Sequence, residues 1–265
     1  MAVFATAIDM RKYIFGTIII LLILGIFLHK KSSEAAFLNR SLVAYWSFED
    51  APSNVARDRS GNGNNGTLTN GPKYTNGRIG QALAFDESND YVGVGNAVVT
   101  SVPLTMCAWF KVVNITTDQA LVWIGDKDVG ASFWGLKFSG TLARKPVSFR
   151  VRGGGVNQLI STATGITSNT WHHACAVSIS SSLRRLYLDG REEVTGTSDV
   201  TPTASDDTNI GRFGDSSPSH YNSGLIDEVR IYNRALSENE IRQLYLQGKK
   251  GRGNPTGSLS NPFIW

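Results

Sequence analysis

The chain has 265 residues with a formal net charge of +4, 41% hydrophobic residues, 27 glycines and six tryptophans. Sandwich folds commonly reach this length as one unit, so we expect one domain with appended ends. Seven of the 26 basic residues but only two of the 22 acidic residues lie outside residues 36–248. The folded part therefore carries no basic excess, which argues against nucleic acid as a partner.

The N-terminal region contains a run of uncharged, mostly apolar residues at 13–28, with a basic pair on each side. The run is apolar on all sides and precedes a polar linker at 29–40, which argues against a core helix. Two interpretations stay open: a signal peptide cleaved after Ala35, or an uncleaved membrane anchor that follows a flank at 1–12. Both place most of the chain outside the cytoplasm, as a membrane-anchored extracytoplasmic domain or a secreted protein.

The segment "GNGNNG" at 61–66 matches the G-x-G-x-x-G pattern of dinucleotide-binding loops. That function requires a helix directly after the glycines, with its N-terminus facing the phosphates. The residues that follow, "TLTNGPKYTNG", contain two Asn-Gly pairs, a proline and no helical apolar repeat. The pattern therefore predicts a tight turn or loop.

Strand patterns alternate with turn signals from Leu42 onward. The segment 104–113 is apolar on both faces, which is typical of a central strand. The segments 171–179 and 184–190 predict a hairpin. The other predicted strands lie at 42–48, 84–95, 133–138, 147–153 and 225–232.

A helix is predicted after the last strand. Ser237 and Glu240 form a capping-box pattern at its start, and an apolar face follows in "ENEIRQLYLQ". Gly248 is expected to end the helix. The remaining residues, 249–265, are rich in Gly, Pro and Ser and are expected to form a flexible tail.

Several motifs, in this order, resemble a laminin-G-like jelly-roll domain of the concanavalin-A-like superfamily over residues 41–248. They are "LVAYWSFED", "DRSGNGNNGTL", "GRIGQALAFDESNDYVGVG", "WHHACAVSI", "LYLDG" and "GLIDEVRIYNRALSENEI". The resemblance implies an all-β fold: a two-sheet antiparallel jelly-roll sandwich with a short C-terminal helix, preceded here by a single hydrophobic N-terminal helix. It also implies a glycan or protein ligand on the concave face or rim.

The sequence argues against an enzyme. Glycanases of this superfamily carry two glutamates spaced along one strand, because cleavage needs an acid and a base or nucleophile on one face. This chain offers only adjacent carboxylates, in "FEDAPS" and "LIDEVR", and neighbours on a strand point to opposite faces. The adjacent His172 and His173 are expected to be structural strand residues.

We therefore expect a non-catalytic, lectin-like module that binds carbohydrate at the cell surface. Trp123, Trp134, Arg150 and Arg152 are the candidate ligand-binding residues, because aromatic faces stack on sugar rings and charged groups bond to hydroxyls. The alternative for the tryptophans is a place in the core. The alternative function is a protein-binding adhesion or structural surface module with no glycan ligand.

The resemblance also implies a structural Ca²⁺ ion that ties the first strand to the last. Calcium takes six to eight oxygen ligands from carboxylates, carbonyls and water. The candidate carboxylates are Asp50, Asp58 and Asp227. The alternative for Asp58 is the cap of a turn.

The only two cysteines are Cys107 and Cys175. Their strands resemble the two cysteine strands of the pentraxins, which implies a disulfide between them, and export to an oxidising compartment favours it. Alternation places Cys107 on the face of Trp109 and Cys175 on the face of Val177, and we expect both to point inward. Two free core thiols are the alternative. The pentraxin ligand site has no clear counterpart here.

Overall fold

The computed structural model describes Leu21 and residues 37–250. Apart from Leu21, the predicted anchor or signal segment at 13–28 lies outside the described residues, and so does the tail beyond Lys250. Within the described ranges, no helix has the length and apolar character needed to cross a membrane. The domain discussed below begins at Ser41.

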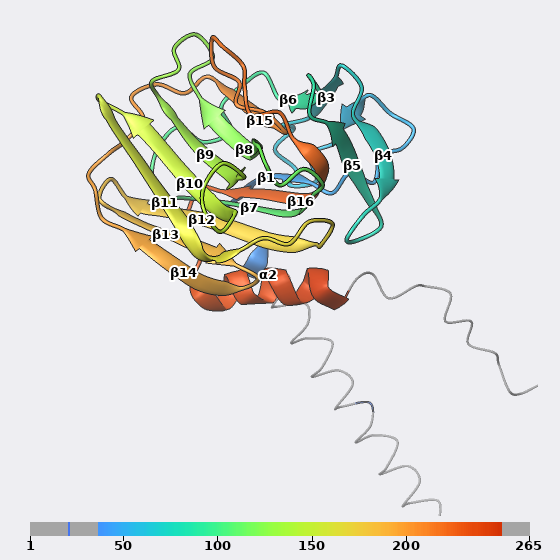
Figure 1. The fold of residues 1–265 in the computed structure, drawn as a ribbon. Helices are drawn as coiled ribbons and strands as arrows, with labels where there is room; N and C mark the ends of the chain where they lie inside the picture. Colours follow the sequence, from blue (N-terminus) through green and yellow to red (C-terminus); the bar gives the residue numbers. More distant parts are fainter. Residues whose placement is uncertain (1–20, 22–36, 251–265) are drawn as a thin grey trace, which may run out of the picture. The chain divides into compact units, whose positions relative to one another are not determined.

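Two antiparallel sheets form a sandwich (Figure 1). The first, sheet A, has the strand order β14-β13-β12-β7-β16-β5-β4, and β1 also pairs with β16. Its strands are β1 (Leu42–Trp46), β4 (Lys73–Asn76), β5 (Gln81–Asp86), β7 (Leu104–Val112), β12 (His172–Ser180), β13 (Leu183–Leu188), β14 (Arg191–Gly196) and β16 (Ser223–Tyr232).

The second sheet, sheet B, has the order β11-β10-β9-β8-β15-β6-β3-β2. Its strands are β2 (Val55–Ala56), β3 (Gly66–Thr69), β6 (Tyr91–Gly93), β8 (Asp118–Gly125), β9 (Phe133–Ser139), β10 (Pro146–Gly153), β11 (Val156–Gly165) and β15 (Asp207–Ile210). The all-β prediction of a two-sheet antiparallel sandwich is thus confirmed.

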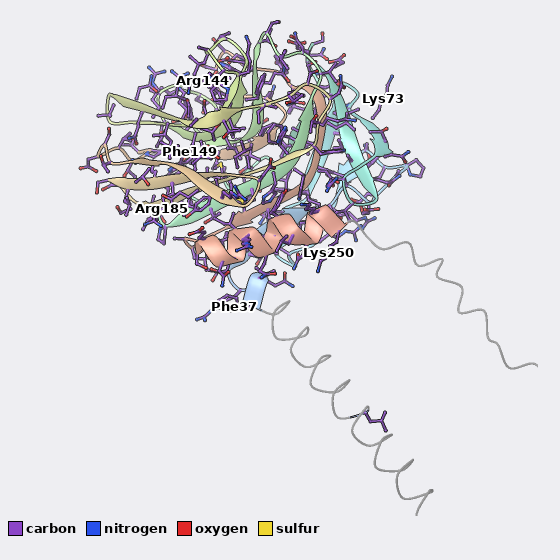
Figure 2. All side chains as sticks on the ribbon, turned by 60° about the horizontal axis from the view of Figure 1, so that its bottom comes forward. Phe37, Lys73, Arg144, Phe149, Arg185 and Lys250 are labelled. Atoms are coloured by element: carbon purple, nitrogen blue, oxygen red, sulfur yellow. A yellow bond between two sulfur atoms is a disulfide. The ribbon has the colours of Figure 1, made fainter. Side chains whose placement is uncertain are left out.

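The main core lies between the sheets and is built from alternate residues of both. Trp46 and Phe110 enter it from sheet A, and Trp134 and Phe149 enter it from sheet B. Side chains fill the space between the two layers, with Phe149 among them (Figure 2). Every residue of β7 except Lys111 is buried, which confirms its central position.

The loop at 61–66 is a turn and leads into strand β3, with no helix after it. Gly61 and Gly63 adopt positive φ angles of 92° and 78°, which glycine reaches without steric cost. The side chains of Asn62 and Asn64 donate hydrogen bonds to carbonyl oxygens of β1. The glycine-asparagine loop therefore fastens itself to the first strand.

The C-terminal helix α2 spans Glu238–Lys250 and packs on sheet A, below β13 and β14 in Figure 1. The capping box is formed: the Ser237 backbone N–H donates to Glu240 Oε2 (2.8 Å), and the Glu240 N–H donates to Ser237 Oγ (3.4 Å). The prediction that Gly248 ends the helix is wrong. Gly248 lies inside it, where a Cβ atom would be 2.2 Å from Trp109 Nε1.

The disulfide between Cys107 and Cys175 is present, and the two residues are direct cross-strand partners on β7 and β12. The expected inward direction is wrong, because Met106, Ala108, Ala174 and Ala176 occupy the main core instead. The cysteines share the outer face of sheet A with Trp109, against which Gly248 of α2 packs. The disulfide is therefore buried on the outer face of sheet A and not in the core between the sheets.

Candidate functional site: the outer face of strands β9 to β11

Strands β9, β10 and β11 present a polar outer face on sheet B, and no helix in the described part of the chain covers it. Directly opposed residues share a face. One cross-strand row runs from Leu159 through Arg150 to Gly135, and the next from Asn157 through Arg152 to Phe133. The third row joins Ser161, Ser148 and Lys137. We call these nine residues the β9–β11 face.

The two predicted arginines lie side by side on this face. Arg150 Nε donates to Asn157 Oδ1 at 2.9 Å, and the guanidinium carbon lies 5.7 Å from the centre of the Phe133 ring. Arg152 Nη1 donates to the Gly130 carbonyl oxygen at 2.7 Å. Partial burial and the charge of Arg152 lower the pKa of Arg150. Both side chains are held by single hydrogen bonds that leave other N–H groups available.

Lys137 is buried on the same face and pairs with Asp118. Burial tends to raise the pKa of Asp118, but hydrogen bonds from Lys137 and from the Thr141 side chain and backbone outweigh it, and the pKa is lowered. His220 lies next to this pair, with Nε2 3.9 Å from Asp118 Oδ2. Burial, followed by the nearby charges of Lys137 and Arg150, lowers the pKa of His220.

Apolar side chains lie beside the arginines. Leu159 is 43% exposed and directly opposes Arg150. Val129, next to Gly130, is 52% exposed. The face therefore combines hydrogen-bond donors with accessible apolar surface, a combination that sequence reasoning did not detect for β11. Asn157 and Leu159 are two residues apart on one strand, so their side chains point to the same side. This spacing is the signal that would have placed both beside the arginines.

The two predicted tryptophans do not contribute an accessible aromatic surface. Trp134 points into the main core, and Trp123 belongs to a small cluster on the outer face with Phe133 and Phe213. Gly135 leaves room for Phe213, whose ring would be 2.6 Å from a Cβ atom there. Both tryptophans are fully buried. Their assignment as sugar-stacking residues is therefore corrected to a packing role.

The three predicted calcium ligands do not come together. Among the described residues, the carboxylates of Asp50, Asp58 and Asp227 do not form a group with ligand atoms within 4.8 Å of one another. Asp58 accepts four hydrogen bonds, from Tyr45 N, Asn64 N and both the N and Oγ of Ser60, so it acts as a turn cap. Asp50 Oδ1 forms an ion pair with Arg59 Nη2 at 2.5 Å.

Asp227 has one carboxylate oxygen without a hydrogen-bond partner. It is fully buried, its Oδ1 has no hydrogen-bond partner, and burial raises its pKa to about 8. Its Oδ2 accepts a hydrogen bond from Ile79 N at 2.9 Å. The same loop contacts Glu49, whose Oε1 accepts from Gln81 N at 3.2 Å and would be 2.0 Å from a Cβ atom at Gly80. Sequence reasoning chose Asp50 and missed its neighbour Glu49.

Comparisons with known proteins agree with this architecture. The Laminin_G_3 family, described as the Concanavalin A-like lectin/glucanases superfamily, matches residues 86–242, more than half of the chain. No curated protein matches the sequence.

Solved structures share the fold. Domain 4 of AbnA, an extracellular arabinanase from Geobacillus stearothermophilus in complex with arabinotriose, is 23% identical, with a TM-score of 0.63 over 77% of this chain and 98% of that one. The binding domain of Paraclostridial Mosquitocidal Protein 1 is 20% identical, with a TM-score of 0.62 over 78% of this chain and 52% of that one. At these identities the likeness establishes the fold alone.

Proposed function

We propose that this chain, which belongs to the Concanavalin A-like lectin/glucanases superfamily, is a non-catalytic carbohydrate-binding module. The observation that carries the proposal is the β9–β11 face. It lies on a rigid sheet and offers Arg150, Arg152 and Asn157 next to the exposed Leu159. The arabinotriose complex of the AbnA domain supports a glycan ligand for a domain of this fold.

The chemistry of the face suits a sugar chain. Sugar rings expose hydroxyl groups, which accept hydrogen bonds from guanidinium N–H groups, and apolar C–H surfaces, which pack on aliphatic side chains. Because β-strands hold Arg150 and Arg152 in fixed positions, binding requires little ordering of the backbone. The site lacks an exposed tryptophan among the described residues, so we expect polar contacts to contribute more than ring stacking.

A glycan array and a polysaccharide pull-down with the full-length protein test the proposal. We expect retention on at least one glycan, and weaker retention for Arg150→Gln. The matched control is Arg242→Gln, which changes an exposed arginine of α2 on the sheet A side. Retention that is identical for both variants would place the ligand on another surface.

A protein-binding adhesion module is the second candidate. Receptor-binding domains of botulinum neurotoxins share the fold, one of them at a TM-score of 0.60 and 15% identity, over 51% of that chain. This candidate predicts no binding on any glycan, together with saturable binding to a protein that survives enzymatic removal of its glycans. Binding to glycans therefore distinguishes the two candidate functions.

The proposed location is the cell surface, either tethered through residues 13–28 or after secretion. A structural calcium ion at Asp227 and Glu49 belongs to the proposal, because a cation would compensate a buried carboxylate that has no other partner on Oδ1. The ion would be held by these two carboxylates and carbonyl groups of the loop at 77–81, away from the β9–β11 face.

A further inference from the structure

We propose that the β9–β11 face selects glycans that carry an anionic group, a carboxylate or a sulfate, over their neutral counterparts. This inference rests on the proposed carbohydrate-binding function and names the class of ligand for the same site. It depends on the charge balance around Arg150 and Arg152.

The first observation is that no carboxylate of the described structure forms an ion pair with either arginine. Neither Arg150 nor Arg152 forms an ion pair there with a carboxylate within 4.0 Å. Their recorded partners are neutral: the amide oxygen of Asn157 and the carbonyl oxygen of Gly130. A guanidinium group offers five N–H donors, so each arginine retains donors for a ligand.

The second observation concerns the acidic residues near the face. Asp118 is committed to Lys137 and Thr141, which neutralises the third cation of the face. Asp215 accepts a hydrogen bond from Ser217 N at 3.0 Å and lies beside Gly130, whose added Cβ atom would be 2.9 Å from Asp215 Oδ2. Asp118 and Asp215 are the two carboxylates whose charges act on Arg150, against the three cations Lys137, Arg150 and Arg152. The face therefore retains a net positive charge.

The third observation is the partial burial of both arginines. Arg150 packs over the Phe133 ring and directly opposes Leu159, which limits the access of water to its guanidinium group. Two like charges on the same strand, two residues apart, also repel each other. A bound anion relieves this repulsion, and arginine binds carboxylate and sulfate oxygens through paired N–H donors.

The test uses full-length protein and pairs of probes that differ only in charge. The pairs are polygalacturonate and its methyl ester, a sialylated oligosaccharide and its desialylated form, and chondroitin sulfate and desulfated chondroitin. We expect at least one acidic member to bind about tenfold or more tightly than its neutral partner. Raising the NaCl concentration from about 0.05 M to about 0.5 M is expected to weaken this binding.

Variants of the arginines connect the preference to the face. Arg150→Gln and Arg152→Gln should each remove most of the preference for the acidic member, while the exposed Arg242→Gln should retain it. Arg150→Lys keeps the positive charge and should retain part of it. Thermal melts check that each variant is folded.

The outcomes separate the two proposals. Equal binding of the acidic and neutral members, with a loss in Arg150→Gln, overturns the anion preference and leaves carbohydrate binding standing. An acidic preference that survives both arginine substitutions also overturns the inference. If no glycan of either class binds, both proposals fall.

Discussion

Asp227 is a buried carboxylate whose Oδ1 has no hydrogen-bond partner. A fully buried carboxylate oxygen without a hydrogen bond costs several kcal/mol unless it is protonated or meets a cation. The loop at 77–81 also contacts Glu49, so a divalent cation bound at this loop would offset the burial of Asp227.

We expect calcium to raise the melting temperature of the protein and EDTA to lower it. Asp227→Asn should abolish the response to calcium, because the amide lacks the negative charge. Asp58→Asn is the matched control: Asp58 is a turn cap with four hydrogen bonds, so the variant should still respond to calcium. Differential scanning calorimetry provides the measurement, and a melt that calcium does not change would contradict the proposed site.

His173 makes stability depend on pH. It is buried next to Trp109, and burial, followed by the charge of Arg230, lowers its pKa from 6.5 to about 3. The unfolded chain therefore binds a proton below about pH 6.5 that the folded chain does not bind until about pH 3, and stability falls as the pH drops through this window.

From pH 7.5 to 4.5, this histidine should cost about 2 to 3 kcal/mol of unfolding free energy. Urea unfolding of wild type and His173→Gln at both pH values measures the effect. We expect the wild type to lose more stability on acidification than the variant does. Equal losses in the two proteins would show that His173 does not cause the acid sensitivity.

At the scale of elements, helix α2 packs on the outer face of sheet A. Its capping box sets the start, and Gly248 permits close contact with Trp109 near the end. The disulfide that joins β7 to β12 lies on the same outer face of sheet A.

Gly248→Ala tests the helix contact. An added Cβ atom would be 2.2 Å from Trp109 Nε1, so the helix or the indole must shift, at a cost of about 1–3 kcal/mol. Alanine favours the helix over glycine by up to about 1 kcal/mol. Whether the variant is more or less stable therefore depends on the size of the steric cost. We expect a lower melting temperature for Gly248→Ala and little change for the exposed Gln247→Ala. A stabilised Gly248→Ala variant would refute the close contact.

Removal of the disulfide by Cys107→Ala together with Cys175→Ala should reduce stability by up to about 4 kcal/mol, because the bridge closes a loop of 68 residues in the unfolded chain. Urea unfolding measures the loss. Alkylation of the denatured, unreduced protein should label no thiol, and two should react after reduction. Two labelled thiols without reduction would rule out the bridge in the protein as made.

At the scale of the whole molecule, the two outer faces of the sandwich differ. Helix α2 covers part of sheet A, whereas the β9–β11 face of sheet B has no helix over it among the described residues. The proposed module would display the exposed β10 and β11 part of this face outside the cytoplasm.

Cell fractionation and sequencing of the mature N-terminus test the proposed location. We expect the protein in the membrane fraction, or in the medium with an N-terminus at Ala36 if the segment at 13–28 is a cleaved signal. Full-length protein recovered from the soluble cytoplasmic fraction would contradict both alternatives.

The sequence by itself predicted the central strands and the capped helix, because alternation and turn chemistry act over a few neighbouring residues. The cysteine pair followed from the family resemblance, and strands such as β8 and β11 were missed. The sequence also named Arg150 and Arg152 as candidate ligand-binding residues, and the structure shows that they share one face of β10. It did not show that Trp123 is covered by Phe213, or that Glu49 rather than Asp50 lies near Asp227.

Those outcomes depended on tertiary structure. Alternation says which residues share a face, but the partners packed against that face decide whether it is inside, covered or open. Cys107 and Trp109 are an example: they follow the predicted alternation, yet they lie on the outer face of sheet A, and Gly248 of α2 packs against Trp109. Phe213 packs over Gly135 of β9, whereas Arg150 and Arg152 on β10 remain partly exposed. This difference comes from long-range packing that no local pattern encodes.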